Sequence, residues 1–179
     1  KGQEALAQMR AVADQKPPAT KDLFELAQFH YRRGETASFL GRGKQSVADY
    51  RKAADLAGQS GDSGELRDRA TYYYGLAELI HGNFSRGIQA IRESIKLAYQ
   101  RPKYTGSVLV RYAILAGVRA KGGEIEPAEK DLDQARSLVA KSVNWSRAMD
   151  RATARTLFDN GRAMVLAARG EFREAEDLM

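Results

Sequence analysis

The stretch that decides the fold is ATYYYGLAELIHGNFSRGIQAIRESIKLA, residues 70–98. Small and apolar side chains recur in both of its halves at spacings of three and four residues, the period of an amphipathic helix. Between the halves lies His81-Gly82-Asn83, and a glycine takes the left-handed conformation that ends a helix at little steric cost. The stretch therefore predicts two helices joined by a tight turn at Gly82.

The pattern around Gly82 recurs along the chain. Counterparts of this glycine are Gly41, Gly123 and Gly170, at successive spacings of 41, 41 and 47 residues. A small residue lies seven positions before each glycine (Gly34, Gly75, Ala116, Ala163) and another five positions after it (Ser46, Gly87, Ala128, Ala175). Nine positions after the glycine comes a large residue (Tyr50, Ile91, Leu132, Met179). Twelve positions after it comes a small residue (Ala53, Ser94, Ala135), and fifteen positions after it comes a leucine (Leu56, Leu97, Leu138). These columns predict an internal repeat of helical hairpins, each of which needs neighbours to bury its apolar stripes.

The columns resemble the tetratricopeptide repeat over about Leu23 to the end of the chain. Residues 65–100 supply the family's glycine as Gly75, its alanine column as Gly87 and its phenylalanine column as Ile91. They depart from the pattern at other columns, where Thr71, Tyr74, Glu78 and Tyr99 replace tryptophan, leucine, tyrosine and proline. The resemblance implies an all-α fold, a right-handed α-α superhelix of hairpins.

The repeat length leaves one structural rival. A period of 41 residues exceeds the usual 34 by about two helical turns, which would lengthen both helices without rotating their faces. Longer repeats of this kind occur in kinesin-light-chain-like arrays and in bacterial sensor and caspase-like proteins. A HEAT-type repeat of about 40–47 residues is the alternative. The turn glycine and the small residue five positions later favour the tetratricopeptide interpretation.

Composition agrees with a helical array. The chain has 179 residues, of which 43% are hydrophobic and 29% charged, with only 4 prolines and no cysteine. This composition supports a packed core and excludes disulfides, thiolate metal sites and cysteine catalysis. No apolar run approaches 18 residues and no signal peptide is visible, which predicts no membrane insertion and favours a soluble, cytoplasmic protein.

Proline, glycine and serine residues separate the expected helices from one another. Together these helices are predicted to form a single domain over 1–179. We expect a leading helix in 3–18, and hairpins in 20–59, 65–100, 105–141 and 144–179, with Thr20 as the first N-cap. The leading helix is either the second half of a repeat or a capping helix. The last hairpin is cut short, so we expect the chain to be part of a larger protein, although a self-capping end is the alternative.

The sequence offers no catalytic constellation, and we expect no enzyme activity, no cofactor and no metal. His30 and His81 lie on different hairpins without ligand spacing, so a partly buried structural role for His30 and a helix-end role for His81 are expected. Gly41-Arg42-Gly43-Lys44 lacks the strand and the glycine spacing of a phosphate loop.

The resemblance implies that the first helices of successive hairpins line a groove for a partner peptide or helix. By register with the family, the groove residues are Tyr31, Glu35, Arg69, Tyr72, Leu76, Leu79, Asn160 and Met164. Tyr31, Tyr72 and Ala113 stand where family members carry carboxylate-clamp lysines, which argues against a chaperone-tail receptor. Of Tyr72, Tyr73 and Tyr74, at least one is predicted to lie in the core and one to be exposed.

A second candidate surface is basic. The net charge is +6, and an arginine stripe falls within an arc of about 80° on the long helix of the last hairpin (Arg147, Arg151, Arg155, Arg162, Arg169). It would attract nucleic acid or an acidic partner, or else pair with acids such as Glu129 on neighbouring helices. The sequence thus favours a protein-interaction scaffold in the sensor or scaffold part of a larger protein, with a basic nucleic-acid module as the alternative.

Overall fold

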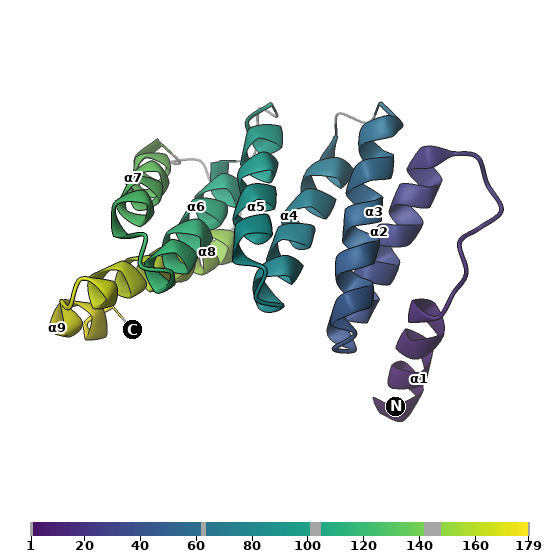
Figure 1. Ribbon diagram of the computed structural model, residues 1–179, viewed down its shortest axis with the longest axis horizontal. Helices are drawn as coiled ribbons and strands as arrows, with labels where there is room; N and C mark the ends of the chain where they lie inside the picture. Colours follow the sequence, from purple (N-terminus) through teal and green to yellow (C-terminus); the bar gives the residue numbers. More distant parts are fainter. Residues whose placement is uncertain (1, 62–63, 101–104, 142–147, 179) are drawn as a thin grey trace. The chain divides into compact units, whose positions relative to one another are not determined.

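The structure, a computed structural model, describes residues 2–61, 64–100, 105–141 and 148–178. Within these ranges the chain forms nine α-helices and no β-strand (Figure 1). They are α1 (Gly2–Ala13), α2 (Leu23–Phe39), α3 (Gly43–Gln59), α4 (Glu65–Ile80), α5 (Phe84–Tyr99), α6 (Thr105–Lys121), α7 (Ile125–Lys141), α8 (Ala148–Ala168) and α9 (Phe172–Glu176). The predicted all-α architecture of sequential hairpins is confirmed.

One predicted helix start needs correction. Helix α2 begins at Leu23 rather than at Thr20, because Asp22 is the N-cap: its Oδ1 accepts the N–H groups of Phe24 at 2.8 Å and Glu25 at 3.2 Å. Thr20 instead accepts the N–H of Asp22 and supports the turn before the helix. In the last hairpin the described part of α8 begins at Ala148 and α9 ends at Glu176, while 142–147 and Met179 lie outside the described residues.

The four predicted turn glycines close their hairpins in the same way. Gly41, Gly82, Gly123 and Gly170 have φ angles of 70°, 79°, 78° and 83°. At Gly82 the glycine N–H donates to the carbonyl of Leu79 at 3.0 Å, and the next N–H, of Asn83, donates to the carbonyl of Glu78 at 2.9 Å. The other three turns repeat this pair of bonds at equivalent positions. It is the Schellman motif, in which a left-handed residue satisfies the last helical carbonyls.

The small-residue columns lie where the two helices of a hairpin touch, and all eight of their residues are buried. A Cβ atom placed on Gly75 would lie 2.8 Å from Ile91 Cγ1 and 3.1 Å from the Gly87 carbonyl oxygen. A Cβ on Gly87 would lie 2.5 Å from Leu79 Cδ2. The backbones of α4 and α5 can therefore approach closely only because both positions lack a side chain.

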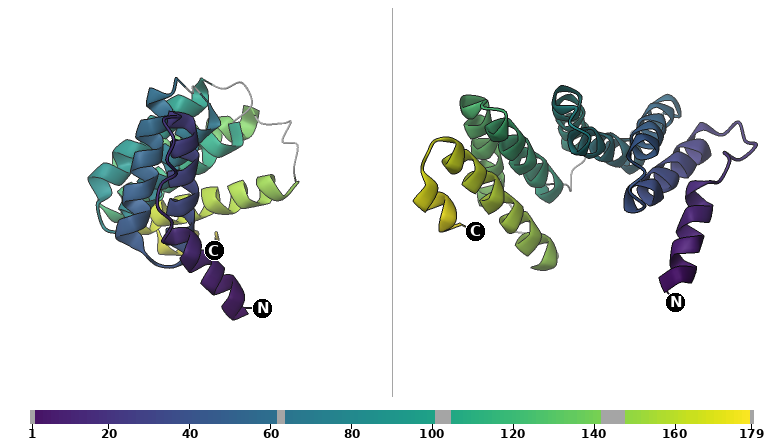
Figure 2. Two further views of the ribbon diagram at one scale, coloured as in Figure 1. Left: turned by 90° about the vertical axis from the view of Figure 1, so that its right-hand side faces the viewer. Right: turned by 60° about the horizontal axis from the view of Figure 1, so that its bottom comes forward.

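The chain divides into two compact units, Lys1–Leu97 and Ala98–Met179. In the first unit α3 packs against both α2 and α4; in the second, α6 packs against both α7 and α8 (Figures 1 and 2). Each unit has its own core, centred on Tyr31, Tyr50, Ala53, Ala70 and Ala77 in the first and on Ala116, Ala120, Ala128, Leu132 and Val165 in the second. One continuous solenoid domain over the whole chain stays a prediction.

None of the helices in the described ranges combines the length and apolar composition needed to cross a bilayer.

Candidate functional site

Helix α4 carries two polar strips on opposite sides. Residues 65, 69, 72 and 76 follow the helical spacing of four, three and four, so they share one side, and residues 67, 71, 74 and 78 share the other. On the first side Glu65 and Arg69 are exposed and Tyr72 and Leu76 are half-buried. Three of the predicted groove residues therefore form one continuous surface, called the Arg69 strip below (Glu65, Arg69, Tyr72, Leu76).

Tyr31 joins α2 to the Arg69 strip. Arg69 Nη2 donates a hydrogen bond to the Tyr31 hydroxyl at 3.0 Å, and its guanidinium carbon lies 5.1 Å from the centre of the Tyr31 ring, within cation–π range. Tyr31 is only 6% exposed. This burial raises the pKa of Tyr31 to about 12, although Arg69 acts to lower it. Tyr31 therefore forms the floor beneath Arg69 rather than an exposed anchor.

The floor is a cluster of three tyrosines. Tyr31 lies with its ring centre 5.7 Å from that of Tyr50 and 6.0 Å from that of Tyr73, and Tyr50 and Tyr73 stack at 5.5 Å. Tyr73 is itself half-buried, and both Tyr73 and Tyr74 pack against the buried core cluster. The prediction that one member of the tyrosine run would be exposed is wrong, because all three are half-buried, with Tyr72 and Tyr74 on opposite sides of α4.

The remaining groove residues differ in their surroundings. Glu35 is half-buried on α2, close enough to Tyr31 to act on its pKa. Leu79 packs against Gly87 within its own hairpin, so it contributes to helix contact. Asn160 and Met164 lie one turn apart on α8 in the second unit, where Asn160 is exposed and the Met164 sulfur packs over Gly117.

The structure describes part of the arginine stripe. Arg147 and the side chain of Arg151 lie outside the described residues, whereas Arg155, Arg162 and Arg169 are exposed on or just beyond α8. Arg169 Nη1 donates a hydrogen bond to Glu129 Oε1 at 2.8 Å. This pairing is the one expected if the stripe is neutralised by acidic residues of neighbouring helices. Arg155 Nε lies 3.8 Å from Asp159 Oδ2 on the same helix. Two of the three described arginines thus already have acidic neighbours.

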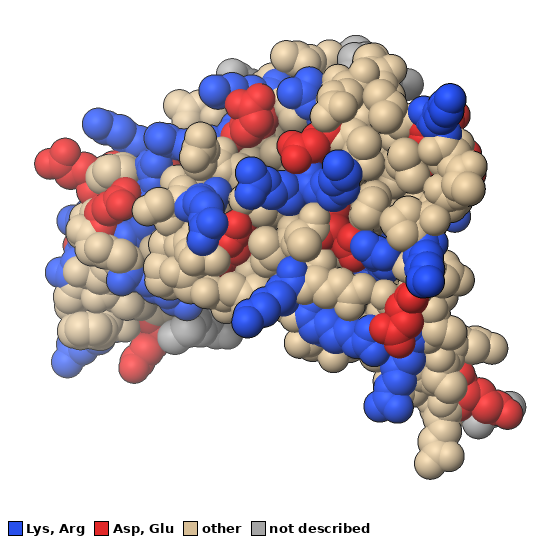
Figure 3. Space-filling view, turned by 45° about the vertical axis from the view of Figure 1, so that its right-hand side comes forward, with Lys and Arg blue, Asp and Glu red and all other residues tan. Residues whose placement is uncertain are grey.

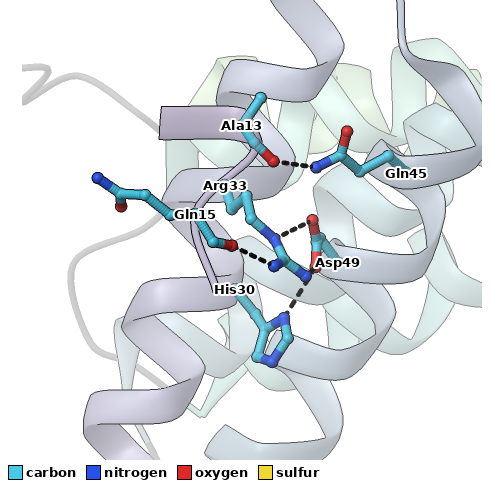
Figure 4. Close-up of polar contacts among 6 residues, drawn as sticks. All are labelled: Ala13, Gln15, His30, Arg33, Gln45 and Asp49. Atoms are coloured by element: carbon cyan, nitrogen blue, oxygen red, sulfur yellow. Dashed lines mark hydrogen bonds and ion pairs between the residues drawn. The ribbon is translucent and has the colours of Figure 1, made fainter. Parts of the chain in front are cut away.

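The most elaborate polar contact is one that the sequence did not predict. Asp49, on α3, is 2% exposed and accepts hydrogen bonds from Arg33 Nε at 2.8 Å and Arg33 Nη2 at 2.7 Å (Figure 4). His30 Nδ1 lies 2.8 Å from the same carboxylate, which confirms the predicted partly buried role of this histidine. Arg33 also donates to the Gln15 carbonyl at 2.8 Å and thereby ties the segment after α1 to the first hairpin.

Two other hairpins also bury a carboxylate. Glu78, 2% exposed, accepts the Tyr74 hydroxyl at 2.8 Å and the Asn83 side-chain amide at 2.6 Å. Asp131 pairs with Arg119 Nη1 at 3.0 Å, and both side chains are buried. Asp49 and Asp131 each lie eight residues after a turn glycine, a signal that the repeat alignment contains. Asp49 and Glu78 are hydrogen-bonded inside their hairpins, so their burial reflects structure. Asp131 is balanced by the buried Arg119 guanidinium, whose Nε forms no hydrogen bond within the described residues.

The segment that was compared with a phosphate loop forms a turn between helices. Gly41-Arg42-Gly43-Lys44 contains the first turn and the start of α3, and the His81 ring lies against Gly43, where a Cβ would meet it at 1.8 Å. Among the residues that the structure describes, no group of three histidine, cysteine or acidic side chains is placed to hold a metal ion.

Known proteins resemble this chain in structure. No family model matches it, and no curated protein matches it. The crystal structure of BtubC (BKLC) from P. vanneervenii superposes with a TM-score of 0.76 at 16% identity, over 99% of this chain and 70% of that chain. Two crystal structures of Podosopora anserina putative kinesin light chain nearly identical TPR-like repeats give TM-scores of 0.73 and 0.72, each at 16% identity over 98% of this chain and 82% of that chain. At this identity the likeness establishes the fold alone: the chain has the all-α fold of TPR-like repeat proteins.

Proposed function

We propose that the chain is a non-catalytic interaction scaffold whose Arg69 strip binds a peptide or helix of a partner protein. The observation that carries the proposal is the convergence of Arg69, Tyr72 and Leu76 on one side of α4, outside the tightly packed core. The TPR-like fold supports it, because arrays of helical hairpins offer preformed binding surfaces.

The chemistry of the strip suits a partner with an apolar anchor next to an acidic group. Tyr72 and Leu76 supply amphipathic and aliphatic area, and tyrosine and arginine are enriched among residues that dominate binding energy. Arg69 offers an exposed guanidinium over the Tyr31 ring, with Glu65 Oε1 3.7 Å from its Nη1, so an acidic group of the partner would compete with Glu65. Arg69 lies against Tyr31, and the Tyr72 ring centre lies 5.2 Å from that of Tyr73, contacts that reduce the side-chain freedom lost on binding.

The nucleic-acid alternative receives less support from the described residues. Arg155 and Arg169 have acidic neighbours, and on the face that Figure 3 turns to the viewer, acidic side chains are interspersed among the basic ones. Nucleic-acid binding also falls steeply as salt rises, whereas an apolar groove is nearly indifferent to salt. Salt dependence therefore separates the two functions.

The test first isolates a partner on the immobilised wild-type chain. It then measures the binding of this partner to two double variants. We expect Tyr72→Ala with Leu76→Glu to abolish binding, and Arg155→Glu with Arg162→Glu to leave it unchanged across a salt titration. Circular dichroism verifies that both variants are helical. Binding that survives the first pair and is lost with the second would overturn the proposal in favour of the arginine stripe.

A further inference from the structure

The side of α4 opposite the Arg69 strip opens into a pocket of about 410 Å³. Helices α3, α4 and α5 line it, so it lies within the first unit. Its polar lining consists of Arg51, Asp55, Arg67, Thr71, Tyr74, Arg86, Gln89 and Glu93. The binding function proposed above makes no use of this pocket.

Three arginines, one from each helix, line the pocket: Arg51, Arg67 and Arg86. Within the described part of the chain, Arg51 and Arg67 form no ion pair and donate no side-chain hydrogen bond. Arg86 Nε lies 3.6 Å from Glu78 Oε1, beyond ordinary hydrogen-bond length. Neighbouring cations repel one another, and an anion held between them would remove that repulsion.

Two of the three arginines, Arg67 and Arg86, lie against neighbouring groups. Glu78, buried and fixed by Tyr74 and Asn83, lies behind Arg86. The Arg67 side chain lies across Gly58 of α3, where a Cβ would come within 3.3 Å of its Nε. Burial raises the pKa of the Tyr74 hydroxyl, as does its bond to Glu78, whereas the charges of Arg51 and Arg86 act to lower it.

Acidic side chains limit the charge that the pocket can accept. Glu93 is paired with Lys96 at 3.5 Å, whereas Asp55 forms no ion pair within the described residues. Three cations and two anions leave one excess positive charge in the lining itself, which the buried Glu78 behind Arg86 offsets. The acids repel any anion, so a single carboxylate or phosphate group placed against the arginines meets less repulsion than a polyanion.

We propose that this pocket binds one oxyanion group, a carboxylate or phosphate carried by a peptide side chain, between Arg51, Arg67 and Arg86. The planar guanidinium presents paired N–H donors that match the two oxygens of such a group. The volume of the pocket admits a side chain rather than only a free ion. This site is separate from the Arg69 strip, and neither proposal depends on the other.

The test is a calorimetric titration of the whole chain with four probes. They are blocked pentapeptides with phosphoserine, glutamate or serine between glycines, and inorganic phosphate. We expect the phosphoserine and glutamate peptides to bind and the serine peptide to fail. If neither anionic peptide binds, the proposed site is wrong. If inorganic phosphate binds as tightly as the anionic peptides, the assignment of the site to a peptide side chain is wrong.

Four substitutions localise the binding. Arg51→Gln and Arg67→Gln should each weaken the anionic peptides by about tenfold or more, because each removes a charged hydrogen-bonding partner. Arg92→Gln, at an exposed position of α5 outside the pocket, should leave binding unchanged. Asp55→Asn should tighten it by removing a competing negative charge. Equal behaviour of Arg51→Gln, Arg67→Gln and Arg92→Gln would overturn the proposal, as would weaker binding by Asp55→Asn.

A negative result for this pocket can be distinguished from a negative result for the Arg69 strip. The variant Tyr72→Ala with Leu76→Glu should retain full affinity for the anionic peptides, because its substitutions lie on the opposite side of α4. Loss of peptide binding in this variant, with helicity preserved, would overturn the assignment of the anion to the pocket.

Discussion

The carboxylate of Asp49 and the guanidinium of Arg33 meet across the α2–α3 interface, where two Arg33 nitrogens lie 2.7 and 2.8 Å from the two carboxylate oxygens. The contact resembles a binding site in its geometry, yet every partner of the buried carboxylate comes from its own hairpin. Its consequence is structural: it fixes how α2 and α3 pair and holds the segment after α1 through the Gln15 carbonyl.

Removal of this carboxylate should destabilise the first unit strongly. We expect Asp49→Ala to lower the free energy of unfolding by about 3 kcal/mol, because Arg33 and His30 would lose their shared partner in a largely dry interface. Asp55→Ala, on the same helix but exposed and outside any ion pair in the described residues, is the matched control and should change it by about 0.5 kcal/mol or less. Urea unfolding monitored by circular dichroism measures both, and equal losses would contradict the prediction.

The glycines at helix contacts should differ in their tolerance of alanine. At Gly75 the added Cβ meets Ile91 Cγ1 and the backbone of α5, which cannot move aside, so Gly75→Ala should cost about 1–3 kcal/mol. At Gly117 the only close atom is the Met164 sulfur, near the end of a flexible side chain. Gly117→Ala should therefore be close to neutral, since alanine also favours the helix by about 0.5–1 kcal/mol. Thermal unfolding of the two variants tests the contrast, which a larger loss at Gly117 would refute.

The turn glycines should resist substitution for a different reason. Gly82 has open space around its Cα but a φ angle of 79°, so Gly82→Ala should lose about 1–2 kcal/mol through backbone strain alone. Gly122, next to a turn but without a positive φ angle, provides the control, and Gly122→Ala should cost markedly less. Chemical denaturation of both variants measures the difference, and an unaffected Gly82→Ala protein would disprove the argument.

Alkaline pH should destabilise the tyrosine cluster. Burial raises the pKa of Tyr31 from 10.0 to about 12, so the folded state holds its proton where the unfolded state has lost it. The corresponding stability is fully present below pH 10 and is lost as the pH rises to about 12. We expect Tyr31→Phe to flatten this decline in unfolding free energy, while Tyr99→Phe, at an exposed position, leaves it unchanged. An identical decline in wild-type and Tyr31→Phe protein would refute the assignment.

Much of the fold could be predicted because its signals are local. A glycine in the left-handed conformation ends a helix whatever surrounds it, so Gly41, Gly82, Gly123 and Gly170 marked their turns from sequence. Small residues at fixed distances from these glycines likewise marked the contacts between paired helices. The start of α2 was misplaced because Thr20 and Asp22 are both competent caps, and only the local geometry of the N–H groups selects Asp22.

The candidate surface was predictable only in part. Helical spacing alone places Arg69, Tyr72 and Leu76 on one side of α4. It does not reveal that Leu79 turns toward Gly87, or that Tyr31 lies beneath Arg69, because these contacts depend on which side of each helix its neighbours cover.

The all-α character, the hairpin turns and the positions where helices approach closely can be derived from the amino-acid order, because each follows from the conformational preferences of a few adjacent residues. The pairing of Arg33 with Asp49, the tyrosine floor and the presence of three arginines around one pocket depend on how the helices pack. Those arrangements join residues that are far apart along the chain, and the packing of apolar faces, which brings them together, leaves no periodic signal for the polar groups it carries along.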